Sequence, residues 1–147
     1  MIYLRFADIS DTERLYVWRN DEMVRKNSFN EEFIPFENHK EWFFRTLKRN
    51  DVLFYVLLKN EEPIEQIRIN VDDGIGVISY SIDGNYRNCG FGKKILELVQ
   101  EKIKEDNSSV TELCGLVKPT NVASQKAFEK LGYKKFLSEF IEYRKKL

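Results

Sequence analysis

The sequence predicts an α/β fold of the α+β type, in which a meander of antiparallel strands is preceded and followed by helices. Three observations lead to this prediction. Runs with strand periodicity follow one another between Val52 and Asp83, with only turn residues between them. Apolar residues at helical spacing occur on both sides of this region. The length of 147 residues suits one domain, so we expect residues 1–147 to form a single unit.

The part of the chain before the meander predicts one strand and two helices. Ile2 to Ala7 alternates apolar and polar residues, which is typical of a half-buried strand. Ser10 or Asp11 can cap a helix whose apolar face consists of Leu15, Trp18 and Met23. Pro35 precedes a second helix, on which Phe43 and Leu47 lie four residues apart.

The meander consists of three predicted strands, Val52 to Leu58, Ile67 to Val71 and Gly76 to Asp83. Turns at Asn60 to Pro63 and at Asp72 to Gly76 separate them. Ile64 is out of phase with the apolar residues that follow it, which indicates a bulge or a late start of the second strand.

After the meander, helices and strands alternate. Gly92 to Glu105 predicts an amphipathic helix with an apolar stripe of Ile95, Leu96, Val99 and Ile103. Thr111 to Val117 predicts a strand, and Asn121 to Leu131 a helix that ends at Gly132. Two aromatic-rich segments, Tyr133 to Phe136 and Phe140 to Tyr143, can pair as terminal strands.

Composition excludes several classes of function. Lys and Arg number 24 and Asp and Glu also 24, so there is no excess positive charge for binding a nucleic-acid backbone. The longest apolar run, Val52 to Leu58, is too short to span a membrane, and we expect a soluble, cytoplasmic protein. Cys89 and Cys114 form neither a disulfide framework nor a zinc site, and His39 is the single histidine. The oligomeric state stays open, a homodimer included.

A phosphate-binding loop is predicted at Arg87 to Lys94, between a strand and a helix. Gly90 and Gly92 allow the backbone to approach a ligand, and the N–H groups at a helix start favour phosphate. Lys93 and Lys94 add positive charge. Such loops also occur for purely structural reasons, and this one lacks the lysine spacing of P-loop enzymes and the three glycines of dinucleotide-binding folds.

In this loop the chain resembles the GNAT family of N-acetyltransferases, whose coenzyme A loop has the pattern Arg/Gln-x-x-Gly-x-Gly/Ala. Arg87, Gly90 and Gly92 match it. A second family motif, Asn-x-x-Ala/Ser-x-x-x-aromatic-x-x-x-Gly-aromatic, is matched by Asn121, Ser124, Phe128, Gly132 and Tyr133. The resemblance extends from about Val52 to Tyr143 and implies a mixed, mostly antiparallel twisted sheet with flanking helices and two strands that splay apart.

The resemblance also implies acetyl-CoA as the co-substrate, with no metal. Its pantetheine arm is expected between the strands Gly76 to Asp83 and Thr111 to Val117, and Pro119 follows where the second strand leaves the sheet. The residues expected to bind the cofactor are Ile82, Asp83, Gly84, Arg87, Asn88, Cys89, Gly90, Phe91, Gly92, Lys93, Asn121, Ser124 and Phe128.

Four residues are candidates for catalysis. Near Tyr80 a backbone N–H can stabilise the oxyanion, and the Asn121 amide can hold pantetheine or a water. His39 and Glu65 are candidate bases, although a lone histidine is more often a packing or capping residue. Asp83 is a further carboxylate that can relay a proton.

The sequence departs from the family at two positions. Many members carry a tyrosine where this chain has Phe128, and that hydroxyl protonates the leaving thiolate. Phe128 then has a packing role, and either Ser124, Tyr133 or a water acts as the acid or the thiolate leaves without a dedicated acid. Glu65 stands where relatives often have glycine.

The N-terminal part contains Trp18-Arg19-Asn20, Val24-Arg25 and His39 followed by Trp42-Phe43. This pattern resembles the subgroup that acetylates nucleotide-linked amino sugars, of the pseudaminic acid type. The expected acceptor-binding residues are Trp18, Arg19, Asn20, Arg25 and Trp42. Arg19 and Arg25 are expected on the diphosphate and the aromatic rings on the base; surface charges and a core tryptophan are the structural alternatives. Two other functions stay open: acetylation of a ribosomal-protein N-terminus, and a coenzyme A-binding module without catalysis.

Overall fold

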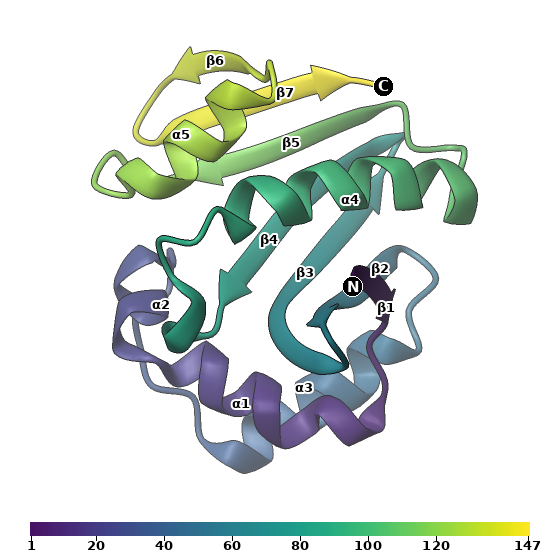
Figure 1. Ribbon diagram of the computed structural model, residues 1–147, viewed down its shortest axis with the longest axis vertical. Coiled ribbons are helices and arrows are strands. Elements are labelled where there is room, and N and C mark those ends of the chain that lie inside the picture. Colours follow the sequence, from purple (N-terminus) through teal and green to yellow (C-terminus); the bar gives the residue numbers. More distant parts are fainter.

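A computed structural model describes residues 1–147 and contains one seven-stranded sheet in the order β1-β2-β3-β4-β5-β7-β6 (Figure 1). All neighbouring strands are antiparallel except β4 and β5. This mixed, mostly antiparallel sheet with flanking helices confirms the predicted fold class. The strands are β1 (Ile2–Phe6), β2 (Val52–Lys59), β3 (Glu62–Asp72), β4 (Ile75–Ile82), β5 (Glu112–Val117), β6 (Lys134–Leu137) and β7 (Ile141–Lys146). The α-helices are α1 (Thr12–Asn20), α2 (Glu22–Asn27), α3 (Phe36–Leu47), α4 (Phe91–Asp106) and α5 (Val122–Lys130), and the 3₁₀ turns are η1 (Ile9–Asp11) and η2 (Gly84–Tyr86).

Two separate cores form on the two faces of the sheet. Side chains alternate along β2, so Tyr55 and Leu57 join the larger core, to which α4 and α5 contribute. Phe54 and Val56 point to the opposite face and join a smaller core with residues of α1 and α3. Figure 1 shows α4 crossing one face of β3 and β4, with α1 and α3 at the bottom of the view. No helix combines the length and the apolar composition that crossing a bilayer requires.

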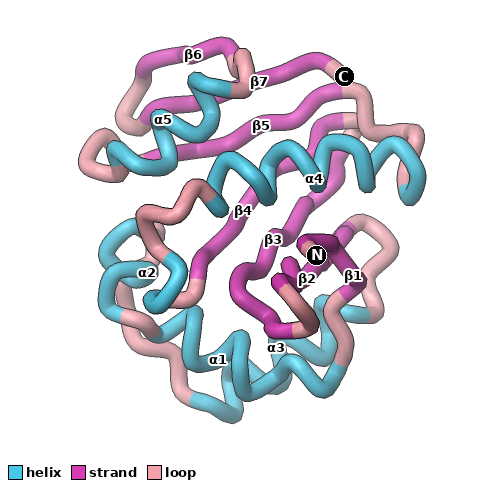
Figure 2. Tube along the Cα trace, in the orientation of Figure 1, coloured by secondary structure: helices cyan, strands magenta, loops and turns pink.

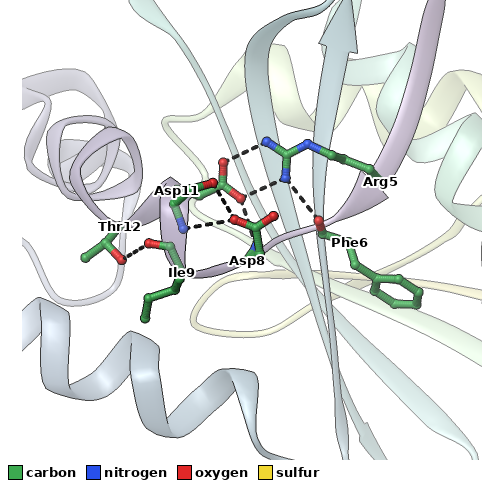
Figure 3. A network of polar contacts seen from close by, with 7 residues as sticks. Arg5, Phe6, Asp8, Ile9, Asp11 and Thr12 are labelled. Carbon is green, nitrogen blue, oxygen red and sulfur yellow. Dashed lines mark hydrogen bonds and ion pairs between the residues drawn. The ribbon is translucent and has the colours of Figure 1, made fainter.

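The start of α1 is fixed by a network of charged side chains (Figure 3). The Asp8 carboxylate accepts a hydrogen bond from the Ser10 N–H, and the Asp8 N–H donates to Asp11 Oδ2 at 2.9 Å. Asp11 is buried and receives two hydrogen bonds of 2.8 Å from the Arg5 guanidinium. Asp11 therefore precedes the helix as predicted, but its carboxylate binds Arg5 instead of capping α1.

The helix predicted to run through Met23 is in fact two helices. Asp21 leaves the helical conformation, with φ −54° and ψ 135°, and separates α1 from α2. Its carboxylate then accepts hydrogen bonds from the N–H groups of Met23 and Val24, which caps α2. The prediction was wrong because Met23 continues the apolar spacing of α1, while the local capping bond of Asp21 outweighs that spacing.

The bulge expected at Ile64 is confirmed. The register between β2 and β3 shifts there, since Leu57 pairs with Glu65 while Leu58 pairs with Pro63. Ile64 is the extra residue, and both Ile64 and Glu65 are fully buried. The strand therefore begins at Glu62, earlier than the predicted Ile67.

The two terminal strands pair with each other as predicted, but β7 lies between β5 and β6. β5 pairs with β7 over its whole length and with β4 only from Ile75 to Ile78. Beyond Ile78 the strands β4 and β5 have no common hydrogen bonds. This splay is the feature of the fold that creates room for a ligand.

Candidate active site

The splay between β4 and β5 opens into a cleft of about 1100 Å³. Ile78, Tyr80 and Ile82 line it on the face covered by α4 and α5, together with the first turns of both helices. Arg68 and Ser79, which alternate with those residues, line it on the opposite face together with α1 and α3. The cleft therefore passes through the sheet and connects its two faces.

The edge of β4 offers free backbone groups to this cleft. The Asp83 N–H donates to the Ile64 carbonyl of β3 at 2.8 Å. In an antiparallel pair the backbone N–H groups of alternate residues point to the same neighbour, so the N–H groups of Ser79 and Ser81 also point toward β3. Tyr80 and Ile82 lie at the intervening positions, so their N–H groups point toward β5, beyond the last pair that β4 forms with it. These are the donors expected for pantetheine and for an oxyanion.

The start of α4 forms the second part of the cleft. Asn88 and Gly90 have left-handed φ values of 61° and 82° and lead into α4, whose first N–H groups have no partner within the helix and belong to cleft-lining residues. Nothing lies within 4 Å of the position that a Cβ of Gly90 would occupy. Lys93, Lys126 and Lys130 line the same region. Such a combination of free N–H groups and positive charge suits the phosphates of coenzyme A.

Arg87 also lines the cleft, but its guanidinium forms an ion pair with Asp21. Figure 2 shows the connection between β4 and α4 passing beside α2. Asp21 therefore has two partners, the N-terminus of α2 and the arginine of the predicted phosphate loop.

Most residues expected around the cofactor line this cleft: Ile82, Arg87, Asn88, Gly90, Phe91, Gly92, Lys93, Asn121, Ser124 and Phe128. Three do not. Asp83 accepts hydrogen bonds from the Trp18 indole N–H and the Asn85 N–H, and lies with Gly84 in a smaller hollow. The Cys89 thiol is exposed and donates to the Arg87 carbonyl. Free N–H groups, an open glycine position and lysines together fit coenzyme A.

Two hydroxyl groups meet where the wall of β4 faces α5. Tyr80 Oη lies 2.7 Å from Ser124 Oγ, and both residues line the cleft. Burial raises the pKa of the Tyr80 phenol, which therefore stays protonated and can donate. Asn121 accepts a hydrogen bond from the Ser124 N–H, which caps α5 and leaves its amide N–H₂ at the cleft.

Phe128 packs tightly on β5. Its ring contacts Gly115 so closely that an added methyl group there would overlap the ring, and it stacks on Tyr143 with centroids 5.2 Å apart. The para carbon, which carries the hydroxyl of a tyrosine, is the atom nearest to Gly115. The packing role expected for Phe128 therefore fits its surroundings.

Glu65 does not line the cleft. Its carboxyl is fully buried, and neither oxygen has a hydrogen-bond partner. Burial raises its pKa well above the ordinary value of 4.5, so the neutral form is favoured. The expectation of a base at Glu65 is corrected because its carboxyl favours the neutral form and is buried behind the cleft lining, close enough to Tyr80 for its charge to act on that phenol.

The structure also corrects several acceptor-side expectations. Trp18 is only 4% exposed and has no free ring face, and Asn20 binds the Ile34 backbone through two hydrogen bonds. Arg25 donates to the carbonyls of Asn20 and Glu31, outside the cleft. His39 is buried away from the cleft, and burial lowers its pKa. These four residues lie outside the cleft lining.

Arg19 and Trp42 do line the cleft, and Arg68 joins them. The guanidinium carbons of Arg19 and Arg68 lie 4.2 Å and 5.0 Å from the Trp42 ring centre. Sequence reasoning missed Arg68. The signal was present, because Gln66, Arg68 and Asn70 form a polar side of the strand that alternates with Ile67, Ile69 and Val71.

No cluster of three or more His, Cys, Asp or Glu side chains suited to a metal ion is present. Comparison with known proteins places the chain in a family. It matches the family model of the acetyltransferase (GNAT) domain over residues 2–134. No curated protein sequence matches.

Several solved structures share the fold. A domain from Methanocaldococcus jannaschii has a TM-score of 0.85 at 20% identity, covering 100% of this chain and 99% of that one. An aminoglycoside acetyltransferase, AAC(6')-Ib, in complex with coenzyme A has a TM-score of 0.82 at 17% identity, covering 99% and 95%. A ribosomal-protein-alanine N-acetyltransferase from Brucella melitensis has a TM-score of 0.81 at 18% identity, covering 98% and 99%.

The family match and the cleft agree. The match covers both motifs and the splayed strands, and the cleft provides the donors that coenzyme A requires. The chain belongs to the GNAT acetyltransferase family and is an acetyl-CoA-dependent N-acetyltransferase.

Proposed function

We propose that this enzyme, acting as one domain over residues 1–147, acetylates a primary amine of a nucleotide-linked amino sugar. The observation that carries the proposal is the charge of the cleft. Seven basic side chains line it and only one acidic side chain, Glu32. Four of the basic residues, Arg87, Lys93, Lys126 and Lys130, lie near the start of α4 or on α5, and Arg19, Lys26 and Arg68 remain for the acceptor. Such an excess favours an acceptor with phosphate groups.

Acetyl-CoA supplies an acetyl group activated as a thioester. The chain's own residues then have three tasks. The N–H groups at Tyr80 and Ile82 donate to the oxygen on which negative charge develops. The Tyr80 phenol, hydrogen-bonded to Ser124, provides a proton at the cleft wall. The Asn121 amide positions a water or the amide groups of the cofactor. The incoming amine must lose a proton, and a water accepts it, because the nearest carboxyl group, that of Glu65, is buried behind the cleft lining.

The positive lining argues against two other acceptor types. Aminoglycosides are polycations, which the three basic side chains left for the acceptor repel, although an aminoglycoside acetyltransferase has the same fold. A protein N-terminus is the second candidate, because a ribosomal-protein acetyltransferase has the same fold as well. That acceptor requires no phosphate-binding group.

The experiment is a thiol-release assay with acetyl-CoA and three kinds of acceptor: UDP-amino sugars, N-terminal peptides and kanamycin. We expect release with one or more UDP-amino sugars, and mass spectrometry should find one added acetyl group. Thiol release with peptides alone would mean that the acceptor is a protein N-terminus and not a nucleotide sugar. If the protein binds coenzyme A but no acceptor causes thiol release, the protein is a coenzyme A-binding module without catalysis.

A further inference from the structure

Two arginines of the cleft, Arg19 and Arg68, lack a carboxylate partner, unlike five other arginines of this protein. Arg5, Arg45, Arg49, Arg87 and Arg144 all form ion pairs. Arg19 has a single polar contact, His39 Nδ1 at 3.4 Å, and Arg68 has one with Asn70 Oδ1 at 3.1 Å. Both are partly buried and line the cleft.

Trp42 holds the two guanidinium groups on one indole ring, at 4.2 Å and 5.0 Å from its centre. Two like charges at one ring repel each other, and the pKa of Arg68 falls to about 10 through burial and the charges of Arg19 and Arg49. A bound anion that contacts both guanidinium groups offsets this repulsion.

His39 fixes the position of Arg19. Its Nε2 lies 2.9 Å from the Thr12 carbonyl oxygen and donates to it, so Nδ1 is left to accept from Arg19 Nη1. The lowered pKa keeps the ring neutral, as this acceptor role requires. His39 is thus a positioning residue for the arginine.

Gln66 adds an unsatisfied polar group beside Arg68, on the same face of β3. Its Nε2 donates to Ser81 Oγ at 2.9 Å, while its Oε1 is buried without a partner. Gln66 also lines the cleft. Since Ser81 can satisfy only one end of the amide, the other end is available to a ligand.

We infer that Arg19 and Arg68, held on Trp42, form a subsite for a phosphate group of the acceptor, with Gln66 accepting from a neighbouring hydroxyl or amine. The inference rests on the proposed function, since it assigns the acceptor's anionic part. Two planar guanidinium groups offer paired N–H donors that match phosphate oxygens. The subsite lies across the sheet from the start of α4, so it is separate from the positions expected for the cofactor phosphates.

The test measures binding instead of turnover. The protein is first saturated with coenzyme A, which occupies the other phosphate site, and is then titrated with UDP by calorimetry. We expect UDP to bind, and Arg19→Met and Arg68→Met each to weaken binding about tenfold or more, the effect of losing a hydrogen-bonded charge. Arg45→Met, which removes an exposed charge on α3 outside the cleft, serves as the matched control and should stay within about twofold.

Thermal unfolding separates a binding role from a structural one. Without ligand, Arg68→Met should melt at the same or a higher temperature than the wild type, because an unpaired charge is removed, yet UDP should no longer raise its melting temperature. Arg68→Lys keeps the charge and gives a folded second variant if the methionine variant does not fold. It should still lose UDP affinity, because an ammonium lacks the planar donors.

Three outcomes would overturn the inference: UDP affinity unchanged in both methionine variants, no UDP binding to the wild type, or succinate binding as tightly as UDP through the same arginines. The last result would make the subsite a carboxylate site. If UDP binding depends on both arginines while no UDP-amino sugar is acetylated, the subsite stands and the proposed acceptor fails.

Discussion

Glu65 carries a carboxyl group in the core with no partner for either oxygen. Because its folded-state pKa is raised, the folded protein holds a proton there that the unfolded chain releases above its ordinary pKa of 4.5. The contribution of Glu65 to stability is therefore greatest below that value and decreases as the pH rises toward the raised pKa. We predict that Glu65→Gln removes this slope and raises the free energy of unfolding at neutral pH by about 1–3 kcal/mol.

Urea unfolding at several pH values between 4 and 9 measures this slope for both proteins. Glu139→Gln, at an exposed turn residue, is the control and should change neither slope nor stability. A variant less stable than the wild type at neutral pH would mean that Glu65 has a partner.

Tyr80 and Tyr133 both carry a buried phenol, and their difference is informative. Tyr80 lines the cleft and contacts Ser124, whereas Tyr133 Oη has no hydrogen-bond partner and lies outside the cleft. We predict that Tyr80→Phe lowers kcat about 10²-fold, with little change in KM for acetyl-CoA. This loss is at the low end of the rate effects that general acids have in enzymes. Tyr133→Phe should leave kcat unchanged. Steady-state kinetics of the two variants decides; equal losses would indicate a packing effect.

The acceptor residues show where sequence reasoning is strong and where it fails. Arg19 and Trp42 were predicted and lie at the cleft, but Arg25 was chosen because it is close to Arg19 in sequence. In space the partner of Arg19 is Arg68, which comes from a strand far along the chain. Pairing across elements depends on tertiary packing, which no local spacing encodes. The cofactor loop was easier to predict because its residues are contiguous.

At the level of elements, Asp21 lies at the break between α1 and α2 and forms an ion pair with Arg87. This pair connects the N-terminal helices to the predicted phosphate loop. A bound phosphate must compete with the Asp21 carboxylate for this arginine. We predict that Asp21→Asn strengthens coenzyme A binding about two- to fivefold, the value of a partly exposed ion pair. The asparagine keeps the side-chain oxygen that caps α2.

Calorimetry with coenzyme A measures this effect. Asp21→Ala is the companion variant, since it frees Arg87 and also removes the cap, so it should combine tighter binding with lower stability. Weaker binding in Asp21→Asn would show that the carboxylate orients Arg87 toward the ligand instead of competing for it.

Most elements were predictable because each has a local pattern. The alternation of β2 and β4, the stripe of α4 and the phase change at Ile64 all appear where the structure places them. The order of the strands was not predictable. Nothing in the residues 141–146 specifies insertion between β5 and β6, because strand order depends on which edges remain open once the rest has packed.

For the whole molecule, the formal net charge of zero conceals an uneven distribution of charge. Basic residues gather at the cleft, and the compensating carboxylates lie elsewhere. Salt screens such a local field, so we predict that KM for the acceptor rises severalfold between about 0.05 and 0.5 M salt while kcat changes little. Arg68→Met should show a weaker salt dependence. A KM independent of salt would contradict a phosphate-bearing acceptor.

The position of β7 has a consequence for how the protein can be damaged. β5 has β7 as its neighbour over all six residues, and a chain cut at the exposed turn near Ser138 could lose that neighbour. The bare edge of β5 would then attract strands of other molecules. A single cleavage in this turn would thereby convert the enzyme into a seed for aggregation.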